Sequence, residues 1–209
     1  MDEHDALIER LAREARPVRR LPAPSLRTAG WMAAALPCGF LASLLLPRGS
    51  FAWSGPGAPW AALGLAASLA LAALAIRTAF ALSIAGERPA HGRWLAAAAA
   101  VWLLAALAGV TGSPDPVGHL GDGVYCYTFM LVAGLPMSAV VVAALRRTRA
   151  LHPAASLAMA GLGIGALAQL LLVFCHPVAG ELFDLGMHVA AAATLVALTV
   201  LGGRRWVRL

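Results

Sequence analysis

The sequence predicts an all-α integral membrane protein in which a short amphipathic helix precedes six transmembrane helices. Two features of the whole chain predict this class. The composition is 60% apolar and only 12% charged over 209 residues, which is abnormal for a soluble domain of that size. The apolar residues also gather in six blocks, each at least as long as the roughly 17 residues that the shortest membrane-crossing helices need. These blocks are Thr28–Leu46, Trp60–Ile84, Trp94–Val110, Gly123–Ala144, Ala154–Phe174 and Leu182–Leu201.

The positions of the arginines predict the orientation of these helices. All 16 basic residues are arginines. Fourteen lie in the N-terminal tail, in alternate loops and at the C-terminus, whereas the other loops hold only Arg48 and the second block holds Arg77. Cationic loops resist translocation, so the side with fourteen arginines is predicted to be the cytoplasm, with both termini inside (N-in, C-in). The net charge of +6 follows from this topology, because basic loops meet anionic headgroups. It therefore does not indicate direct binding to nucleic acid.

The chain divides into a cytoplasmic tail and linker (residues 1–27), the membrane domain (28–201) and a basic C-terminal tail (202–209). In the first of these, Leu7, Ile8 and Leu11 recur at helical spacing, and acids precede arginines as the helix dipole favours. Pro17 is predicted to end this helix. A helix this short is marginal by itself, so we expect its apolar stripe to dock on the membrane surface or on a partner.

The non-cytoplasmic face has a different chemistry. The fourth block begins near Cys126 and the fifth ends near Cys175, so the two thiols are predicted to lie at similar depth. Asp184 and His188 share one face of the sixth helix. Thiolate, imidazole and carboxylate groups suit soft or borderline divalent metals, although the spacing matches no compact zinc signature. Ordinary packing, a redox-active cysteine pair and a metal-responsive site all stay open. The candidate metal ligands are Cys126, Cys175, His176, Asp184 and His188.

The sequence lacks the features that are typical of membrane enzymes and transporters. The chain has no C-x-x-C pair for a thiol oxidoreductase. The interiors of the apolar blocks hold no carboxylates, which proton-coupled transport would need. We therefore expect no enzymatic activity and no required cofactor. A small membrane transporter or a thiol-redox membrane protein is the alternative, and an assembly partner without signal input is a third reading.

Four segments resemble the NrsF family of membrane-bound anti-sigma factors, and they follow one another in the family's order. They are LIERLAREARPVRRLPAPSLR (Leu7–Arg27), CYTFMLVAGLP (Cys126–Pro136), LRRTRALHPAASLAMAGLGIGAL (Leu145–Leu167) and CHPVAGELFDLGMH (Cys175–His188). The most distinctive features are Pro-Val-Arg-Arg-Leu after a short acidic helix, together with the two cysteines.

The resemblance implies a multi-pass protein of the bacterial inner membrane whose partner is a sigma-F-type extracytoplasmic-function (ECF) sigma factor. The protein would hold this partner at the cytoplasmic face until a metal or oxidative stress signal from outside the cytoplasm releases it. Cys126 and Cys175 match the family's paired cysteines, with a transient divalent heavy-metal ion as a candidate signal. The residues expected to contact the partner are Leu7, Ile8, Leu11, Arg19, Arg20, Arg146 and Arg147.

Overall fold

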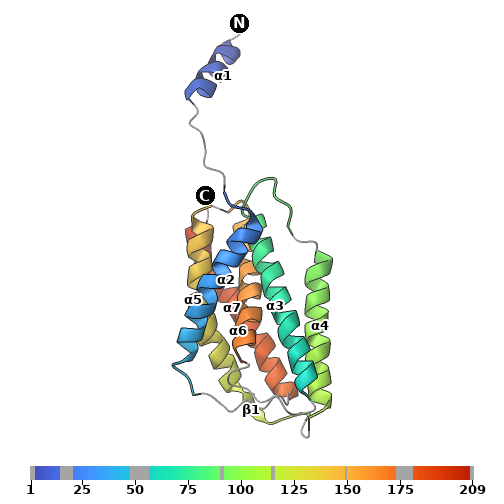
Figure 1. Cartoon of the computed structure of the whole chain (residues 1–209). Helices are drawn as coiled ribbons and strands as arrows, with labels where there is room; N and C mark the ends of the chain where they lie inside the picture. Colours follow the sequence, from blue (N-terminus) through green and yellow to red (C-terminus); the bar gives the residue numbers. More distant parts are fainter. Residues whose placement is uncertain are drawn as a thin grey trace.

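The computed structural model describes residues 3–14, 21–47, 57–89, 92–113, 116–148, 150–172 and 181–207. Within these ranges almost all regular structure is helical, as predicted. Six long helices stand side by side in an upright bundle, and α1 stands clear of it (Figure 1). The elements are α1 (Glu3–Glu14), α2 (Pro24–Ser43), α3 (Ala58–Ala81), α4 (Gly92–Thr111), the short strand β1 (Leu120–Gly123), α5 (Val124–Arg146), α6 (Pro153–Leu172) and α7 (Leu182–Val207).

Five of the helices in the described ranges, α3 to α7, are long and apolar enough to cross a membrane. They support the prediction of a membrane protein. The helix α2 matches the first predicted block but is not among the five, because it begins at Pro24 and includes the polar Ser25 and Arg27 in its first turns. The number of crossings and their direction therefore stay predictions.

The centre of the bundle is α6, and α4 lies at its periphery. In the most apolar stretch of α6, 67% of the residues are buried, against 11% in α4. Close approach of α6 to its neighbours depends on the glycines that the sequence places on it. A β-carbon added at Gly161 would lie 2.6 Å from Val196 Cα on α7, and one added at Gly163 would lie 3.1 Å from the Ala72 carbonyl oxygen on α3. Small residues at such positions let helix backbones come close together in membranes.

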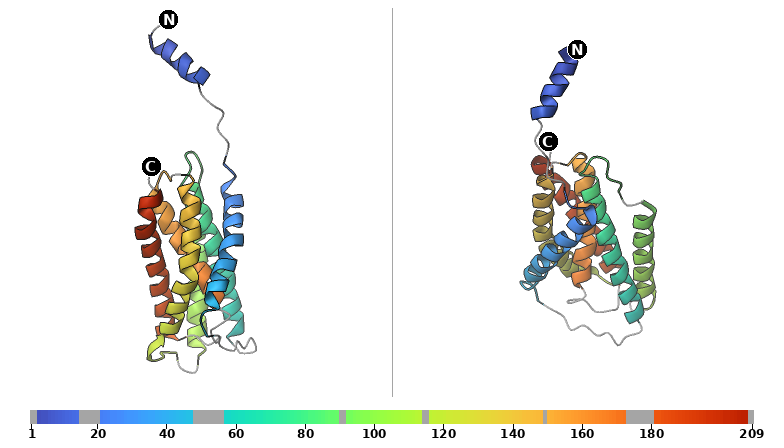
Figure 2. Two further views of the ribbon diagram at one scale, coloured as in Figure 1. Left: turned by 90° about the vertical axis from the view of Figure 1, so that its left-hand side faces the viewer. Right: turned by 45° about the horizontal axis from the view of Figure 1, so that its top comes forward.

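The two ends of the bundle differ in charge. The arginine-rich end, where α3, α5 and α7 finish, carries Arg88, Arg93, Arg146, Arg147, Arg204 and Arg205. The opposite end, which we call the β1 end, carries the strand and the first turns of α5 and α7, and Figure 2 shows both ends from two further sides. The C-terminus lies at the arginine-rich end.

One arginine ties three elements together at the arginine-rich end. In the first turn of α2, the guanidinium of Arg27 lies 3.4 Å from Ser83 Oγ and 3.3 Å from Thr148 Oγ1. It also stacks on the ring of Phe80 at the end of α3, 4.3 Å from the ring centroid. These contacts connect the start of α2, which follows the tail, to α3 and to the segment after α5.

At the β1 end, the segment that precedes β1 caps α7. The first N–H groups of a helix have no acceptor within that helix. Here Leu182 N donates to the Pro116 carbonyl at 3.0 Å, and Phe183 N donates to the Val117 carbonyl at 3.4 Å. The hydroxyl of Tyr125 donates to the carbonyl of Pro47, which joins the start of α5 to the segment after α2. The start of α7 is thus held against the segment that leads into α5.

Candidate metal centre

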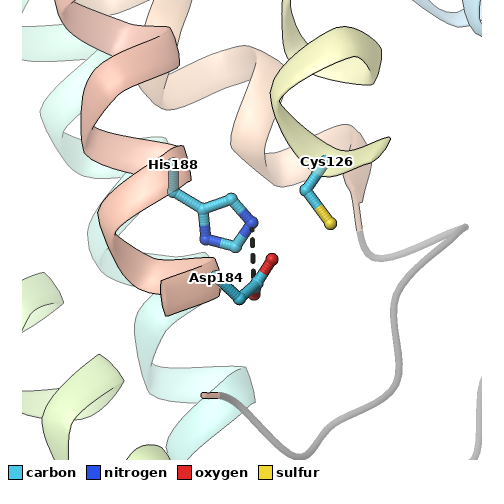
Figure 3. A group of neighbouring side chains, drawn as sticks. All are labelled: Cys126, Asp184 and His188. Atoms are coloured by element: carbon cyan, nitrogen blue, oxygen red, sulfur yellow. Dashed lines mark ion pairs between the residues drawn. The ribbon is translucent and has the colours of Figure 1, made fainter. Parts of the chain in front are cut away.

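Three metal-ligating side chains meet at the β1 end, one from α5 and two from α7. Cys126 lies in the first turn of α5, Asp184 in the first turn of α7 and His188 one turn later. Their candidate ligand atoms all lie within 4.8 Å of one another. Figure 3 shows the imidazole and the carboxylate projecting from one helix toward the thiol on the other. The spacing of four residues puts Asp184 and His188 on one face, as the sequence predicts.

The cluster is sheltered from solvent. Asp184 Oδ2 lies 3.5 Å from His188 Nε2, and their side chains are 7% and 12% exposed, while Cys126 is 5% exposed. A carboxylate in such surroundings is costly unless nearby positive charge or hydrogen-bond donors compensate it. The position of Asp184 supplies one compensation, because the N-terminal turn of a helix carries partial positive charge. The nearby imidazole supplies another when it is protonated.

The donor set fits a borderline or soft divalent cation such as Zn²⁺ or Cd²⁺, for which thiolate and imidazole are favoured ligands. Bond lengths of about 2.0–2.3 Å put neighbouring ligand atoms of a tetrahedral site roughly 3.5 Å apart. The carboxylate and imidazole already have that separation. Because no pair of ligand atoms exceeds 4.8 Å, the cysteine sulfur needs to approach them by at most about 1.3 Å (4.8 minus 3.5). Closing the site would therefore bring the thiol of α5 closer to α7.

Gly123 makes this close approach of α5 and α7 feasible. It is the residue before α5 and has a φ of +80°, a conformation that residues with a β-carbon rarely adopt. A β-carbon added there would lie 2.8 Å from Asp184 Cα and 3.0 Å from Asp184 Oδ1. Gly123 thus meets the backbone of α7 at the residue that supplies the carboxylate.

Gly123→Ala is therefore expected to disturb both stability and the cluster. The positive φ alone costs a residue with a β-carbon about 1–3 kcal/mol, and the added methyl would push Asp184 away. Gly121→Ala is the matched control, since Gly121 has a φ of +113° but no atom within 4 Å of an added β-carbon. We expect both variants to unfold at lower temperature and only Gly123→Ala to bind Cd²⁺ more weakly. Equal Cd²⁺ affinity in the two variants would contradict a positioning role for Gly123.

A family model described as "NrsF: Negative regulator of sigma F" matches residues 11–209. The chain belongs to the NrsF family. No curated protein and no solved structure matches it. The match confirms the resemblance identified from the sequence segments. As a member of the NrsF family, the chain is a negative regulator of a sigma factor, which implies a sigma factor as its partner and a regulatory role.

Not all predicted site residues of this NrsF-family chain come together. Cys126, Asp184 and His188 do, whereas Cys175, His176, Arg19 and Arg20 lie outside the described residues. The side chains of Leu7, Ile8 and Leu11 are exposed on α1. The family match begins at Leu11. Arg146 and Arg147 are exposed where α5 ends. Twenty residues of helix separate Cys126 from Arg146, a distance of roughly 30 Å.

Gly123 was not predicted as a positioning residue. The sequence predicted that the helices bearing Cys126 and Cys175 are neighbours, and it named the sixth helix as a further source of ligands. The first two of these helices do pack against each other as α5 and α6, but Cys175 lies outside the described residues. The described partners of Cys126 come from the sixth, α7. A signal for Gly123 was present, because the Gly-Asp-Gly run before α5 is typical of a turn with positive φ.

Proposed function

We propose that this NrsF-family protein holds a sigma-F-type ECF sigma factor at the cytoplasmic face of the bacterial inner membrane. It releases the factor when a metal or oxidative signal reaches the non-cytoplasmic side. One observation carries the proposal. The cluster of Cys126, Asp184 and His188 lies at one end of α5 and α7, and the arginines that would face the cytoplasm lie at the other end of the same two helices.

The proposed topology has six crossings with both termini inside. The five apolar helices α3 to α7 support it, and α2 supplies the remaining crossing. The fourteen arginines on one side of the predicted topology support its direction, because positively charged loops are retained in the cytoplasm. In this orientation α1 and Arg146 face the cytoplasm, and Cys126 faces the oxidising compartment.

The sigma factor binds the apolar stripe of α1. Leu7, Ile8 and Leu11 are 53%, 64% and 58% exposed, so the 12-residue helix leaves its apolar face uncovered. A helix of that length is marginal in water unless its apolar face packs against something. Recognition of an amphipathic helix in a groove meets that need. Arg146 and Arg147, with Arg19 and Arg20 of the linker, provide charge complementarity around the docked helix.

Cys126, Asp184 and His188 bind the metal, with Cys175 and His176 as further ligands, and binding draws α5 toward α7. In the oxidative version of the signal, Cys126 and Cys175 form a disulfide, and an external oxidant takes up the two electrons and two protons. Both versions act on the same helix end. A signal must favour the releasing arrangement by several kcal/mol to shift most of the population, and metal–thiolate binding free energies are large enough.

The change in helix arrangement passes from the cluster to the arginine-rich end along the interface between α5 and α7. These two helices lie side by side (Figure 2, left). Tyr127 Oη and Thr194 Oγ1 are 3.1 Å apart, and Ser138 Oγ and Thr199 Oγ1 are also 3.1 Å apart. Between these two contacts, a β-carbon added at Gly134 would lie 2.7 Å from the side chain of Leu195. Close-packed interfaces of this kind change between discrete arrangements rather than deforming gradually. Movement at the cluster therefore reaches the arginine-rich end.

Release of the bound sigma factor by added Cd²⁺ tests the proposal. The full-length protein is purified from membranes together with each tagged ECF sigma factor of the same genome in turn. We expect one sigma factor to remain bound and Cd²⁺ to weaken its binding by roughly 5–150-fold, the range of ordinary allosteric coupling. Mg²⁺ serves as the control, since it prefers oxygen ligands. A complex that Cd²⁺ leaves intact would contradict metal sensing, and the absence of any bound sigma factor would contradict the partner.

The alternative is a small transporter or a thiol-redox membrane protein. It predicts uptake of labelled Cd²⁺ into vesicles that contain the purified protein. The proposed function predicts binding without net uptake. The sheltered position of Cys126, Asp184 and His188 near the helix ends rather than mid-span favours binding.

A further inference from the structure

The proposed function assigns no ligand to a groove between α5 and α7 at the arginine-rich end, although Ser138, Thr199 and Arg146, which line it, take part in that function. Its volume is about 400 Å³, within the roughly 300–1,000 Å³ typical of small-molecule sites. The walls are mostly apolar and exposed, and they include Ala139, Ala143, Leu198 and Gly202. Both helices are among the five that are apolar enough to cross a membrane. In the membrane, the outer faces of these helices meet lipid.

The floor of the groove holds two hydroxyl groups joined by a hydrogen bond, in which Thr199 donates to Ser138. Ser138 Oγ and Thr199 Oγ1 are 3.1 Å apart, and both side chains are buried. Ser138 in turn donates to the Gly134 carbonyl oxygen at 3.0 Å. With these hydrogen bonds made, an apolar occupant could lie over the floor without leaving either hydroxyl unpaired.

The mouth of the groove is cationic. The guanidinium groups of Arg146 and Arg205 each lie over the ring of Trp206, 5.5 Å and 5.3 Å from its centroid. Arg146 and Trp206 also line the groove itself. In the described part of the chain neither guanidinium forms an ion pair with a carboxylate. Tryptophan and arginine at a helix end are typical of the level of the lipid headgroups.

We propose that this groove binds an anionic phospholipid. One acyl chain lies between α5 and α7, and the phosphate group accepts hydrogen bonds from Arg146 and Arg205. Guanidinium groups match phosphate oxygens in geometry as well as in charge. An apolar groove that ends at Arg146, with Arg205 beside it on Trp206, is complementary to a molecule with an apolar chain and an anionic head. The inference depends on the membrane location alone and not on the sigma factor.

Native mass spectrometry of the full-length protein, delipidated in detergent, tests the assignment. The two probes are dioleoyl phosphatidylglycerol and dioleoyl phosphatidylcholine, which differ in net charge. We expect the first lipid to bind more tightly and to lose roughly tenfold or more in affinity in the Arg146→Ala/Arg205→Ala variant. Arg93→Ala is the charge control, because Arg93 also stacks on a tryptophan, Trp94, at 5.5 Å but lines no part of this groove.

A second variant fills the groove and leaves both arginines in place. An added β-carbon at Gly202 would meet no atom within 4 Å, so Gly202→Leu should fold and should occupy the space of the acyl chain. Gly30→Leu is its control, because Gly30 on α2 is exposed and equally free of neighbours. We expect Gly202→Leu to lower lipid affinity and Gly30→Leu to leave it unchanged.

Three outcomes would overturn the proposal. Equal binding of the two lipids would show that the headgroup charge is not recognised. Unchanged lipid affinity in Gly202→Leu would show that the lipid binds elsewhere. Dimers that form without lipid and dissociate in Gly202→Leu would show that the groove holds a helix from a second copy of the chain.

Discussion

Cys126→Ser is expected to weaken the binding of Cd²⁺ to the purified full-length protein by at least roughly 100-fold. Loss of a residue that only supports a metal ligand costs 10–100-fold, and loss of the thiolate itself removes the ligand that soft cations prefer. The remaining carboxylate and imidazole of Asp184 and His188 are hard and borderline donors. Titration against a competing chelator measures the affinity, and the ultraviolet charge-transfer band of a cadmium thiolate reports the bond.

Cys38→Ser is the matched control for this loss. Cys38 lies on α2 and is partly exposed, and it is not part of the cluster, so we expect Cd²⁺ affinity to stay at the level of the unmodified chain. Cys175→Ser tests the second cysteine, which the proposal treats as a further ligand, and a weaker Cd²⁺ complex is expected. Unchanged affinity in Cys126→Ser would remove this residue from the metal site.

In cells, Cys126→Ser should keep the regulator bound to its sigma factor. We expect Cys126→Ser to abolish the cadmium-induced rise in transcription from promoters of the partner sigma factor, while basal transcription stays low. A response that persists when both Cys126 and Cys175 are serine would rule out thiol sensing and leave the family assignment intact.

The substitution of Leu7, Ile8 and Leu11 by aspartate together is expected to have the opposite result, which is constitutive sigma-factor activity. These are the exposed large apolar residues of α1, and anchoring residues at an interface contribute about 2 kcal/mol or more each. In the complex with the sigma factor these three side chains would be buried. Replacing them with charged residues should weaken sigma-factor binding by more than about 100-fold. Target transcription without added metal and co-purification of the sigma factor measure the effect.

The polar face of α1 provides the control. Arg10 Nε lies 3.0 Å from Glu14 Oε1, and both side chains are largely exposed, 76% and 63%. Such a pair contributes about 0.5 kcal/mol or less to helix stability, so Arg10→Gln/Glu14→Gln should leave the sigma factor bound. Retention of the sigma factor by the triple aspartate variant would exclude α1 as the docking segment. The Cd²⁺ affinity of that variant should be unchanged, because the cluster lies at the opposite end of the bundle.

Much of the fold and part of the candidate site could be predicted because they depend on local pattern. Apolar blocks of sufficient length predict helices α3 to α7, since a helix satisfies its own backbone hydrogen bonds in lipid. The spacing of Asp184 and His188 predicts a shared face, because helical periodicity is a property of neighbouring residues. The bounds of the first helix were predicted less well, since α2 begins at Pro24, before the first predicted block, and includes Arg27.

The sequence by itself determined the membrane class, the helices, the distribution of charge along the chain and the family. Only the tertiary structure decided that Cys126 meets α7. Residues 58 and 62 positions apart along the chain become neighbours only when helices pack, and packing depends on how whole surfaces fit. Here that fit depends on two glycines of the α5 segment, which have no side chain to keep the helices apart. Gly123 against Asp184 and Gly134 against Leu195 bring α5 and α7 into close contact, and no local periodicity indicates which helix a glycine will face.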